Sequence, residues 1–266
     1  MPAETSLQRR SAARTAVVWD ALRDVLTRVT GRNDAGDTGG TARVVDVGGG
    51  TGGLAVRTAG LGHDVTVVDP SPDALAILAR RADESGVADR VTAVQGDLGT
   101  LADGSLADRV PAGSADVVLC HGVLEIVDDV PAALASIAAL LRPGGVLSLL
   151  VGQRHAAVVT RAMAGHFAQA LAILDSTDDA GPAGTTGTTG TGRRFTADEV
   201  AAVLDDAGFD TDAMQAVRVF VDLVPSSLVD LEPGAAERLV ALEQAVAHRP
   251  EYLPLATQIH VVATRR

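Results

Sequence analysis

Hydrophobic residues near the start of the chain recur three or four positions apart, whereas further along they gather in short blocks. Between residues 6 and 30 the apolar positions share one face of a helix and arginines occupy the other face, which predicts one amphipathic helix. Residues 33–40 (NDAGDTGG) are typical of a linker. We therefore expect residues 1–33 to provide a helix that covers the rest of the chain.

Short apolar blocks then alternate with helical patterns as far as residue 152. The blocks predict strands at 43–47, 64–69, 90–95, 115–121 and 145–152. The intervening segments predict a helix that ends near Gly60 and helices at 72–85 and 130–141. Strands separated by helices favour an α/β fold, with a parallel sheet and helices on both of its faces.

The alternation changes after residue 152. Residues 155–174 have a helical pattern, and 175–192 form a low-complexity stretch rich in Gly and Thr. We expect residues 153–195 to form a helix followed by a flexible insertion.

The end of the chain returns to helix and strand patterns. Thr196 and Glu199 form a capping-box pattern that predicts a helix up to Gly208. Two final strands are expected at 215–224 and 257–264, with a helix near 235–247. Because no internal repeat is visible, we predict a single domain over residues 1–266.

Composition excludes several classes of protein. The mean hydropathy of the 266 residues is slightly positive, which excludes a solvated, disordered chain. No apolar run approaches the roughly 18 residues that a membrane-spanning helix needs. The first residues lack the apolar stretch of a secretory signal, and a single cysteine, Cys120, allows no internal disulfide. These features predict a cytoplasmic protein without a membrane partner.

Charge narrows the chemistry further. The chain has 22 basic and 34 acidic residues, a net charge of −12, and it contains no lysine. Catalysis through a lysine Schiff base and a lysine-bearing phosphate loop are therefore excluded. Four Phe, one Tyr and one Trp disfavour an extended platform for stacking bases. The acidic body would repel nucleic acid at long range, although a local basic patch could still bind it.

A glycine-rich loop is the strongest local motif. It follows a predicted strand and precedes a helix, within the segment VVDVGGGTGG at residues 44–53. Only small residues let the backbone of such a loop approach a ligand closely. Its glycines include the pattern G-x-G-x-x-G, and Asp69 lies about twenty residues further on, so the loop alone also suits a dinucleotide. We expect the loop to bind a cofactor through four of these glycines: Gly48, Gly49, Gly50 and Gly52.

Acidic residues at the ends of the predicted strands favour a cationic cofactor. Asp46 lies under the loop, where a carboxylate suits the ammonium group of S-adenosylmethionine better than a pyrophosphate; alternatively, it only braces the loop. Asp69 is placed to bind both ribose hydroxyls, because Ser71 already provides the cap of the next helix. Asp97 and Leu98 would hold the adenine through its amino group and its face.

In this order the motifs resemble those of the class I S-adenosylmethionine-dependent methyltransferases. The resemblance implies a Rossmann-like sheet of seven strands whose last strand is antiparallel. It also implies that S-adenosylmethionine binds at the carboxyl ends of strands one to four.

Longer segments resemble the bacterial tRNA 5-carboxymethoxyuridine methyltransferases, which methylate the carboxylate of a modified wobble uridine. By this resemblance Arg14 would reach from the cover helix to the carboxylate of the cofactor, and His121 would lie beside the sulfonium. Gly48 and Gly49 would line the cofactor, and Asp69 would hold its ribose. The similar segments are residues 14–26, 121–127, 141–150, 216–222 and 242–265.

The chain departs from this family at two places that concern the acceptor. A run of lysines typical of the family is replaced by GTTGTTGTGRR, in which only Arg193 and Arg194 are basic. Aromatic residues expected near Cys120, Ile126 and Gly152 are replaced by small or aliphatic ones. Both changes weaken binding to an anticodon, since they remove charge and stacking.

Three arginines are candidates for binding an anionic acceptor, although each could simply be solvated: Arg154, Arg161 and Arg218. Solvent exposure is likewise the alternative for Arg14, and a strand-end packing role is the alternative for His121.

Other polar residues predict structural roles. Glu125, Asp128 and Asp129 would cap or solvate the next helix, and Cys120 would be buried. His155 and His166 lack the spacing of metal ligands, so no metal is expected.

Three hypotheses for the function remain. The first is a methyltransferase for a tRNA carboxylate, and the second is a methyltransferase for a small anionic metabolite. The third is a non-catalytic or NAD-dependent protein with a Rossmann-like loop. Aligning two bound reactants can lower a barrier by about 7–11 kcal/mol, and a carboxylate nucleophile needs no general base. No catalytic residue is therefore assigned.

Overall fold

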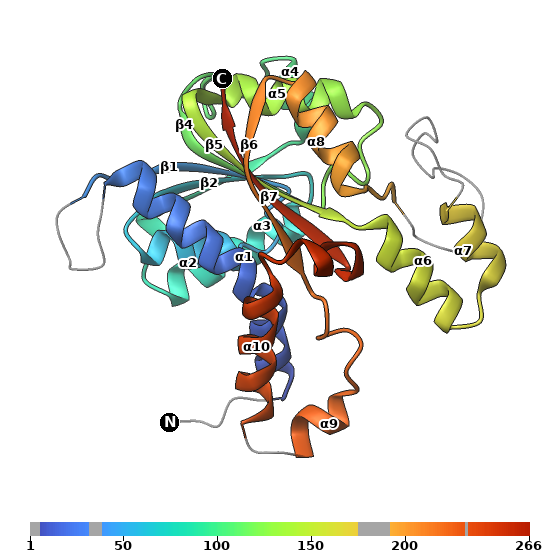
Figure 1. Cartoon of the computed structure of the whole chain (residues 1–266). Coiled ribbons are helices and arrows are strands. Elements are labelled where there is room, and N and C mark those ends of the chain that lie inside the picture. The colour runs from blue at the N-terminus through green and yellow to red at the C-terminus, as the bar shows by residue number, and fades with distance from the viewer. Residues whose placement is uncertain (1–5, 32–38, 175–191, 232–233) are drawn as a thin grey trace.

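The computed structural model describes residues 6–31, 39–174, 192–231 and 234–266 (Figure 1). Within these residues, seven strands form one sheet in the order β3-β2-β1-β4-β5-β7-β6. Strand β7 runs antiparallel to β5 and β6, and the other pairs in the order are parallel. This confirms the predicted sheet with an antiparallel last strand. The strands are β1 (Arg43–Val47), β2 (Asp64–Asp69), β3 (Val91–Gln95), β4 (Ala115–His121), β5 (Leu141–Gly152), β6 (Phe209–Val217) and β7 (Gln258–Arg265).

Helices connect the strands and cover both faces of the sheet (Figure 1). Among the helices that the structure describes, none has the length and hydrophobicity needed to cross a bilayer. The helices are α1 (Ser6–Thr30), α2 (Gly53–Gly60), α3 (Pro72–Glu84), α4 (Leu98–Ala102), α5 (Val130–Leu140), α6 (Arg154–Met163), α7 (Phe167–Leu174), α8 (Ala197–Asp206), α9 (Ser226–Leu231) and α10 (Ala235–Val246), with short 3-10 segments η1 (Ala88–Arg90) and η2 (Pro250–Leu255).

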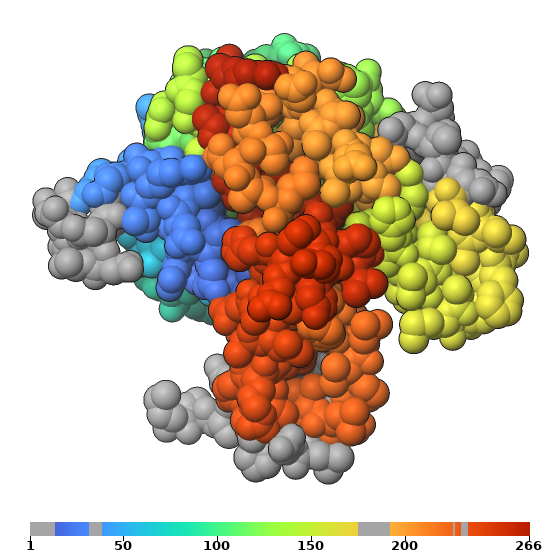
Figure 2. Space-filling view, viewed as in Figure 1, coloured from blue at the N-terminus to red at the C-terminus, as the bar shows by residue number. Residues whose placement is uncertain are grey.

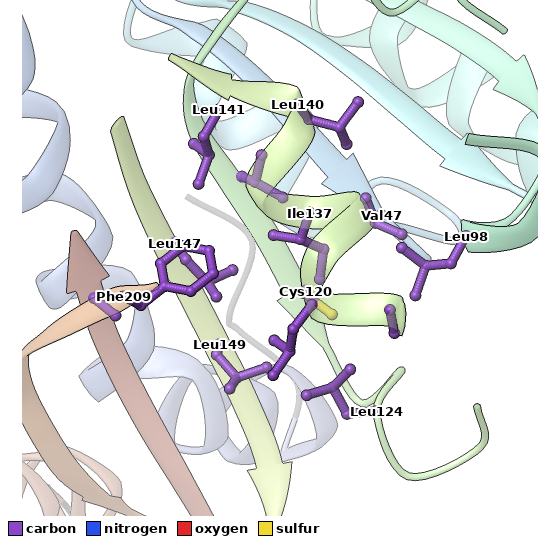
Figure 3. Packing of buried hydrophobic residues seen from close by; sticks show 14 of the residues in the cluster. Val47, Leu98, Cys120, Leu124, Ile137, Leu140, Leu141, Leu147, Leu149 and Phe209 are labelled. Carbon is purple, nitrogen blue, oxygen red and sulfur yellow. The ribbon is translucent and has the colours of Figure 1, made fainter. Parts of the chain in front are cut away.

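The central strand β4 contributes side chains to both cores. Val118 and Cys120 pack toward α5 and α8, and Val117 and Leu119 pack toward α1, α2 and α3. Because successive residues of a strand point to opposite faces, an almost continuous apolar strand is suited to burial on both sides. Figure 3 shows the first of these cores, in which Cys120 lies among large apolar side chains. The expected burial of Cys120 is confirmed.

Helix α1 packs on the sheet as the predicted cover helix. Leu22 and Leu26 are buried in the core on this face of the sheet, and the Arg57 guanidinium on α2 stacks 3.9 Å from the ring centroid of Trp19. The space-filling view shows the blue surface of α1 against the red surface of α10 (Figure 2). Gln244 on α10 donates a hydrogen bond to Asp20 on α1 at 2.6 Å.

Two predicted elements were wrong in their extent. The helix predicted over 155–174 is divided into α6 and α7 by Gly165, whose φ is +78°, and the strand predicted from residue 145 begins at residue 141. The short helices α4 and α9 were not predicted. The linker at 33–40 and the flexible insertion at 175–192 lie almost entirely outside the described residues.

The strand predicted at 215–224 was wrong for most of its length. The strand β6 starts directly after Gly208 and ends at Val217. The apolar run that follows leaves the sheet, because Glu243 on α10 replaces a strand partner for its backbone. The carboxylate of Glu243 accepts hydrogen bonds from the N–H groups of Val219, Phe220 and Val221 at 2.9, 2.8 and 2.7 Å.

Substitution of Glu243 tests this arrangement. In Glu243→Gln an amide N–H group replaces one acceptor oxygen and faces backbone donors inside the protein, where Glu243 is 0% exposed. Leaving such a buried group unsatisfied costs about 1–3 kcal/mol, so we expect the free energy of unfolding in urea to fall by that amount. The control Glu84→Gln, at an exposed position, should change it by less than about 0.5 kcal/mol. Equal effects of the two substitutions would contradict the role of Glu243.

Candidate functional site

The glycine loop after β1 is held by the end of β2. The Oδ2 atom of Asp69 accepts a hydrogen bond from the Gly50 N–H group at 2.9 Å, and its Oδ1 atom accepts one from Ser71 N–H at 2.9 Å. The Gly48 N–H group donates to the Val68 carbonyl at 2.7 Å. Ser71 caps α3, as expected, by accepting from Ala74 N–H. Asp69 therefore fixes both the loop and the start of α3.

The loop also needs glycine for lack of space. A Cβ atom at Gly49 would lie 2.5 Å from Oδ2 of Asp46. At Gly52, where φ is +77°, it would lie 2.0 Å from Cδ1 of Leu78. A side chain at Gly49 would collide with the end of β1, and one at Gly52 would collide with α3, so either would displace the loop.

Asp46 is buried beneath the loop. Its side chain is 4% exposed, and burial, with the neighbouring charge of Asp69, raises the pKa of its carboxyl to about 7. Such a group is poorly stabilised as an anion in the unbound protein and would gain from a nearby cation.

A cavity of about 640 Å³ opens at the carboxyl ends of β1, β2, β3 and β4. This is the edge at which open parallel sheets bind ligands. Further lining comes from the segment between β4 and α5, including Ile126 and Val127, which were not predicted as site residues. Half of the predicted cofactor residues line this cavity: Gly48, Asp69, Asp97, Leu98 and His121.

The role of Asp97 is partly structural. One carboxylate oxygen accepts from Thr100 N–H at 2.9 Å and completes a capping box at the start of α4. This fixed carboxylate and the largely buried Leu98 both line the cavity, which leaves the predicted contact with adenine as a proposal.

The remaining predicted residues do not line the cavity. Asp46, Gly49, Gly50 and Gly52 lie in or beneath the loop that borders it. Arg14 lies elsewhere: its guanidinium forms an ion pair with Asp222, with 2.8 Å between Nη2 and Oδ1. The predicted contact of Arg14 with the carboxylate of the cofactor is not seen in this arrangement and stays a prediction.

A second cavity of about 540 Å³ adjoins the first, since Ile126 lines both. Two of the arginines expected to bind an anionic acceptor, Arg161 and Arg218, line it, together with Arg193 and Arg194. Burial is the main cause that lowers the pKa of Arg194, and the charges of Arg161 and Arg218 act in the same direction. The four guanidinium groups thus concentrate positive charge in one cavity.

The backbone of Arg218 is strained. Its φ is +62°, which is uncommon for a residue with a side chain, and Asp222 accepts from its Nε atom at 2.7 Å. Strained residues of this kind cluster at functional sites. Asp222 therefore holds Arg218 through one carboxylate oxygen and Arg14 through the other.

Two predicted roles were wrong. Glu125 does not cap the next helix: its Oε1 atom accepts from Gly152 N–H at 2.8 Å, and the residue lines the second cavity. Burial raises the pKa of Glu125. Arg154 cannot bind an acceptor there, because it is buried and paired with Glu199 on α8.

Asp128 and Asp129, which were also expected to cap or solvate the next helix, differ in their positions. Asp129 caps α5 by accepting from Ala132 N–H at 2.9 Å, as predicted, and Asp128 lines the larger cavity. Across the described ranges, no three His, Cys, Asp or Glu side chains are grouped so that they could hold a metal ion.

Residues 45–147 match a family described as a methyltransferase domain. The tRNA 5-carboxymethoxyuridine methyltransferase of Escherichia coli K12 is 28% identical over 252 residues, which are 95% of this chain and 88% of that protein. A ubiquinone biosynthesis O-methyltransferase of Xanthomonas euvesicatoria pv. vesicatoria is 38% identical over 124 residues, which are 47% of this chain and 48% of that protein.

A solved S-adenosylmethionine-dependent methyltransferase from Mesorhizobium loti has the same fold. Its TM-score is 0.55 at 19% identity, and the match covers 95% of this chain and all of that one. The sequence matches are to methyltransferases, which favours S-adenosylmethionine over a dinucleotide as the cofactor.

Asp69→Asn should weaken the binding of S-adenosylhomocysteine. The amide would turn an N–H group toward either Gly50 N–H or Ser71 N–H and would remove a charge-assisted hydrogen bond worth about 1.5–3 kcal/mol. We expect calorimetry to give a dissociation constant at least about tenfold higher. Asp73→Asn, at an exposed position in the first turn of α3, is the control. If Asp73→Asn changed the affinity as much as Asp69→Asn, the role of Asp69 in fixing the loop would be contradicted.

The pKa of Asp46 predicts proton release on binding. With a pKa of about 7, Asp46 is largely protonated at about pH 6, and a cationic ligand should ionise it. We expect calorimetry in buffers of different ionisation enthalpy to show that binding of S-adenosylmethionine to the wild type releases up to one proton between about pH 6 and 7. Asp46→Asn should abolish this release.

The unbound protein provides an independent measurement. Because the pKa of Asp46 is raised in the folded state, the folded chain holds a proton that the unfolded chain has lost between about pH 4 and 7. Stability should therefore fall as the pH rises through this range, and less so in Asp46→Asn. Identical pH profiles of the two proteins would contradict the raised pKa.

Proposed function

We propose that this chain is an S-adenosylmethionine-dependent methyltransferase that methylates a carboxylate of an anionic acceptor, in line with its matches to methyltransferases. The acceptor that we favour is the carboxylate of a modified uridine in tRNA, in line with the name of the E. coli relative. Both tRNA and small metabolites are found in the cytoplasm, which is where the proposal places the enzyme.

The observation that carries the proposal is the arginine-lined cavity beside the proposed donor cavity. It holds four arginines against the carboxylates of Glu125 and Asp222, in a chain whose net charge is −12. Arg218 is already paired with Asp222, whereas Arg161 has no acidic partner in the described part of the chain. A half-buried excess of guanidinium groups suits a carboxylate or phosphate, which they can bind with two parallel hydrogen bonds.

The residues of the two cavities would act by alignment. When bound, S-adenosylmethionine supplies an activated methyl group. Asp46 would provide negative charge near its cationic part, and Asp69 would hold its ribose. Arg161 would orient the acceptor carboxylate from the other cavity. A carboxylate is ionised and nucleophilic at neutral pH, so this chain need not provide a base. Holding the reacting atoms in line can by itself account for about 7–11 kcal/mol.

Two observations bear on the size of the acceptor. The E. coli tRNA-modifying relative matches 95% of this chain, including the segments beyond β5, whereas the O-methyltransferase matches less than half. This coverage favours tRNA. A small anionic metabolite is the second candidate, and it is favoured by the complete lack of lysine and the acidic body.

The deciding experiment uses a methyl donor labelled in its methyl group. Purified enzyme is incubated with bulk bacterial tRNA that lacks the methyl ester and, separately, with a panel of small carboxylic acids. A methyl ester formed on a carboxylate is released as methanol by mild alkali, whereas N-, C- and ether-methyl groups are retained. Labelling of tRNA in alkali-labile form supports the favoured acceptor; alkali-stable labelling of any acceptor contradicts carboxylate methylation.

Arg161→Gln should weaken the binding of the acceptor without weakening the binding of the cofactor. Removal of one guanidinium that binds a carboxylate loses about 1.5–3 kcal/mol, so we expect KM for the acceptor to rise about tenfold or more. The affinity for S-adenosylhomocysteine should stay within about twofold, because Arg161 lies outside the donor cavity. Arg109→Gln removes the same charge from an exposed loop and is the matched control. An unchanged KM in Arg161→Gln would contradict the placement of the acceptor.

A further inference from the structure

A chain of polar side chains crosses the apolar sheet from the donor cavity to the surface. His121 Nε2 lies 2.9 Å from Ser148 Oγ, and Ser148 Oγ lies 2.8 Å from His260 Nε2. His260 Nδ1 lies 2.7 Å from Gln215 Oε1, and Gln215 Nε2 lies 3.2 Å from His248 Nε2 at the surface. We call these five residues the polar chain. The three middle members are buried, so each needs its partners.

Sheet register places the members of the polar chain on one face. His260 on β7 lies opposite Gln215 on β6 and Leu150 on β5. His121 on β4 pairs with the same Leu150. Ser148 precedes Leu150 by two residues, and its side chain therefore points to the same side of β5. Three neighbouring strands thus each carry a polar residue on this face, and these residues connect His121 with the far edge of the sheet.

The donor and the acceptor of each hydrogen bond between His121 and Gln215 follow from the end of the polar chain at Gln215. The Gln215 amide is oriented with its oxygen toward Nδ1 of His260, and this oxygen can only accept. That orientation requires the proton of His260 to be on Nδ1 and leaves a lone pair on Nε2. The Ser148 hydroxyl then donates to His260 and accepts from His121. His121 must therefore be protonated on Nε2, which leaves the lone pair of its ring on Nδ1.

Both rings are neutral at neutral pH. Burial lowers the pKa of His121 to about 4 and that of His260 to about 3, and the two rings lie edge to face with centroids 5.9 Å apart. A neutral ring brings no positive charge into the cavity that would hold a sulfonium.

The polar chain orients and does not conduct protons. A hydroxyl or an imidazole can accept a proton on one side and release one on the other. The amide of Gln215 cannot do so at neutral pH, because its oxygen would have to become cationic. Proton transfer from His121 to the surface therefore stops at Gln215, and the remaining role is to fix the ring and its tautomer.

We propose that Ser148, His260 and Gln215 are positioning residues that hold His121 as the Nε2–H tautomer, so that its Nδ1 lone pair serves as a hydrogen-bond acceptor for the cationic methyl donor. The contact with the donor rests on the proposed function, through the placement of the donor in the cavity that His121 lines. The tautomer itself rests only on the hydrogen bonds of the folded chain.

The first experiment measures the tautomer in the ligand-free protein. Long-range proton–nitrogen NMR of protein labelled with ¹⁵N-histidine distinguishes a protonated from an unprotonated ring nitrogen, and His121→Asn assigns the signals. We expect Nε2–H for His121 and Nδ1–H for His260. The opposite tautomer of His121 in the wild type would overturn the proposal.

Variants of Gln215 separate positioning from packing. Gln215→Glu keeps an acceptor for the Nδ1–H group of His260, so the tautomer of His121 should be unchanged. Gln215→Leu has a similar size but no acceptor, so both tautomers of His121 should be populated. A single unchanged tautomer in Gln215→Leu and in Ser148→Ala would show that the polar chain has no positioning role.

The second experiment tests the contact with the donor. In His121→Asn the amide oxygen can occupy the place of the Nδ1 acceptor, whereas in His121→Gln the longer amide reaches Ser148 in the place of Nε2. We expect S-adenosylmethionine to bind His121→Gln about tenfold more weakly than His121→Asn, as one lost hydrogen bond to a charged group predicts. Equal affinities of the two variants would overturn the contact.

The same measurements separate this failure from that of the proposed function. If the donor does not bind in the cavity at all, Asp69→Asn would also leave its affinity unchanged. If only the contact with His121 is wrong, Asp69→Asn would still weaken binding, while the two His121 variants would bind equally.

Discussion

The carboxylate of Asp69 is the constraint on which the donor site depends. It ends β2, and its two oxygens accept from the backbone of the glycine loop and from the start of α3. Asp46 lies close enough for its own pKa to be raised by the charge of Asp69. The unbound protein therefore keeps two acids at one strand edge at an electrostatic cost. A cationic ligand would relieve this cost, and a pyrophosphate would increase it. This is a physical reason why a glycine loop of a kind also found in dinucleotide sites would favour S-adenosylmethionine here.

The two cavities have opposite charge and meet at Ile126. Acidic residues border the larger one, and four arginines line the smaller one. The arginine cavity is also tied to the cover helix, because Asp222 pairs with Arg14 on α1 through one oxygen and with Arg218 through the other. The loop that carries Asp222 is itself held by Glu243 on α10. Acceptor binding would thus be coupled mechanically to elements from both ends of the chain.

Local patterns predicted what local interactions determine. The strands from β1 to β5, the glycine loop and the capping box at Thr196 follow from short-range patterning, and they were largely correct. The errors occur where a residue distant in the sequence determines the local structure. The strand expected at 215–224 ends early because Glu243 takes its backbone N–H groups. Arg154 is unavailable because it pairs with a residue 45 positions away.

The polar chain has a signal in the sequence. Ser148 and His260 each interrupt an apolar strand, and Gln215 is buried at the apolar end of β6. A buried polar residue of this kind must find a partner within the sheet. These residues are compatible only in the observed register, since a shift by one residue would turn one of them toward the opposite face. The same contacts that orient His121 therefore penalise misaligned pairing of β5, β6 and β7. The register of the antiparallel strand and the chemistry at the end of β4 depend on the same hydrogen bonds.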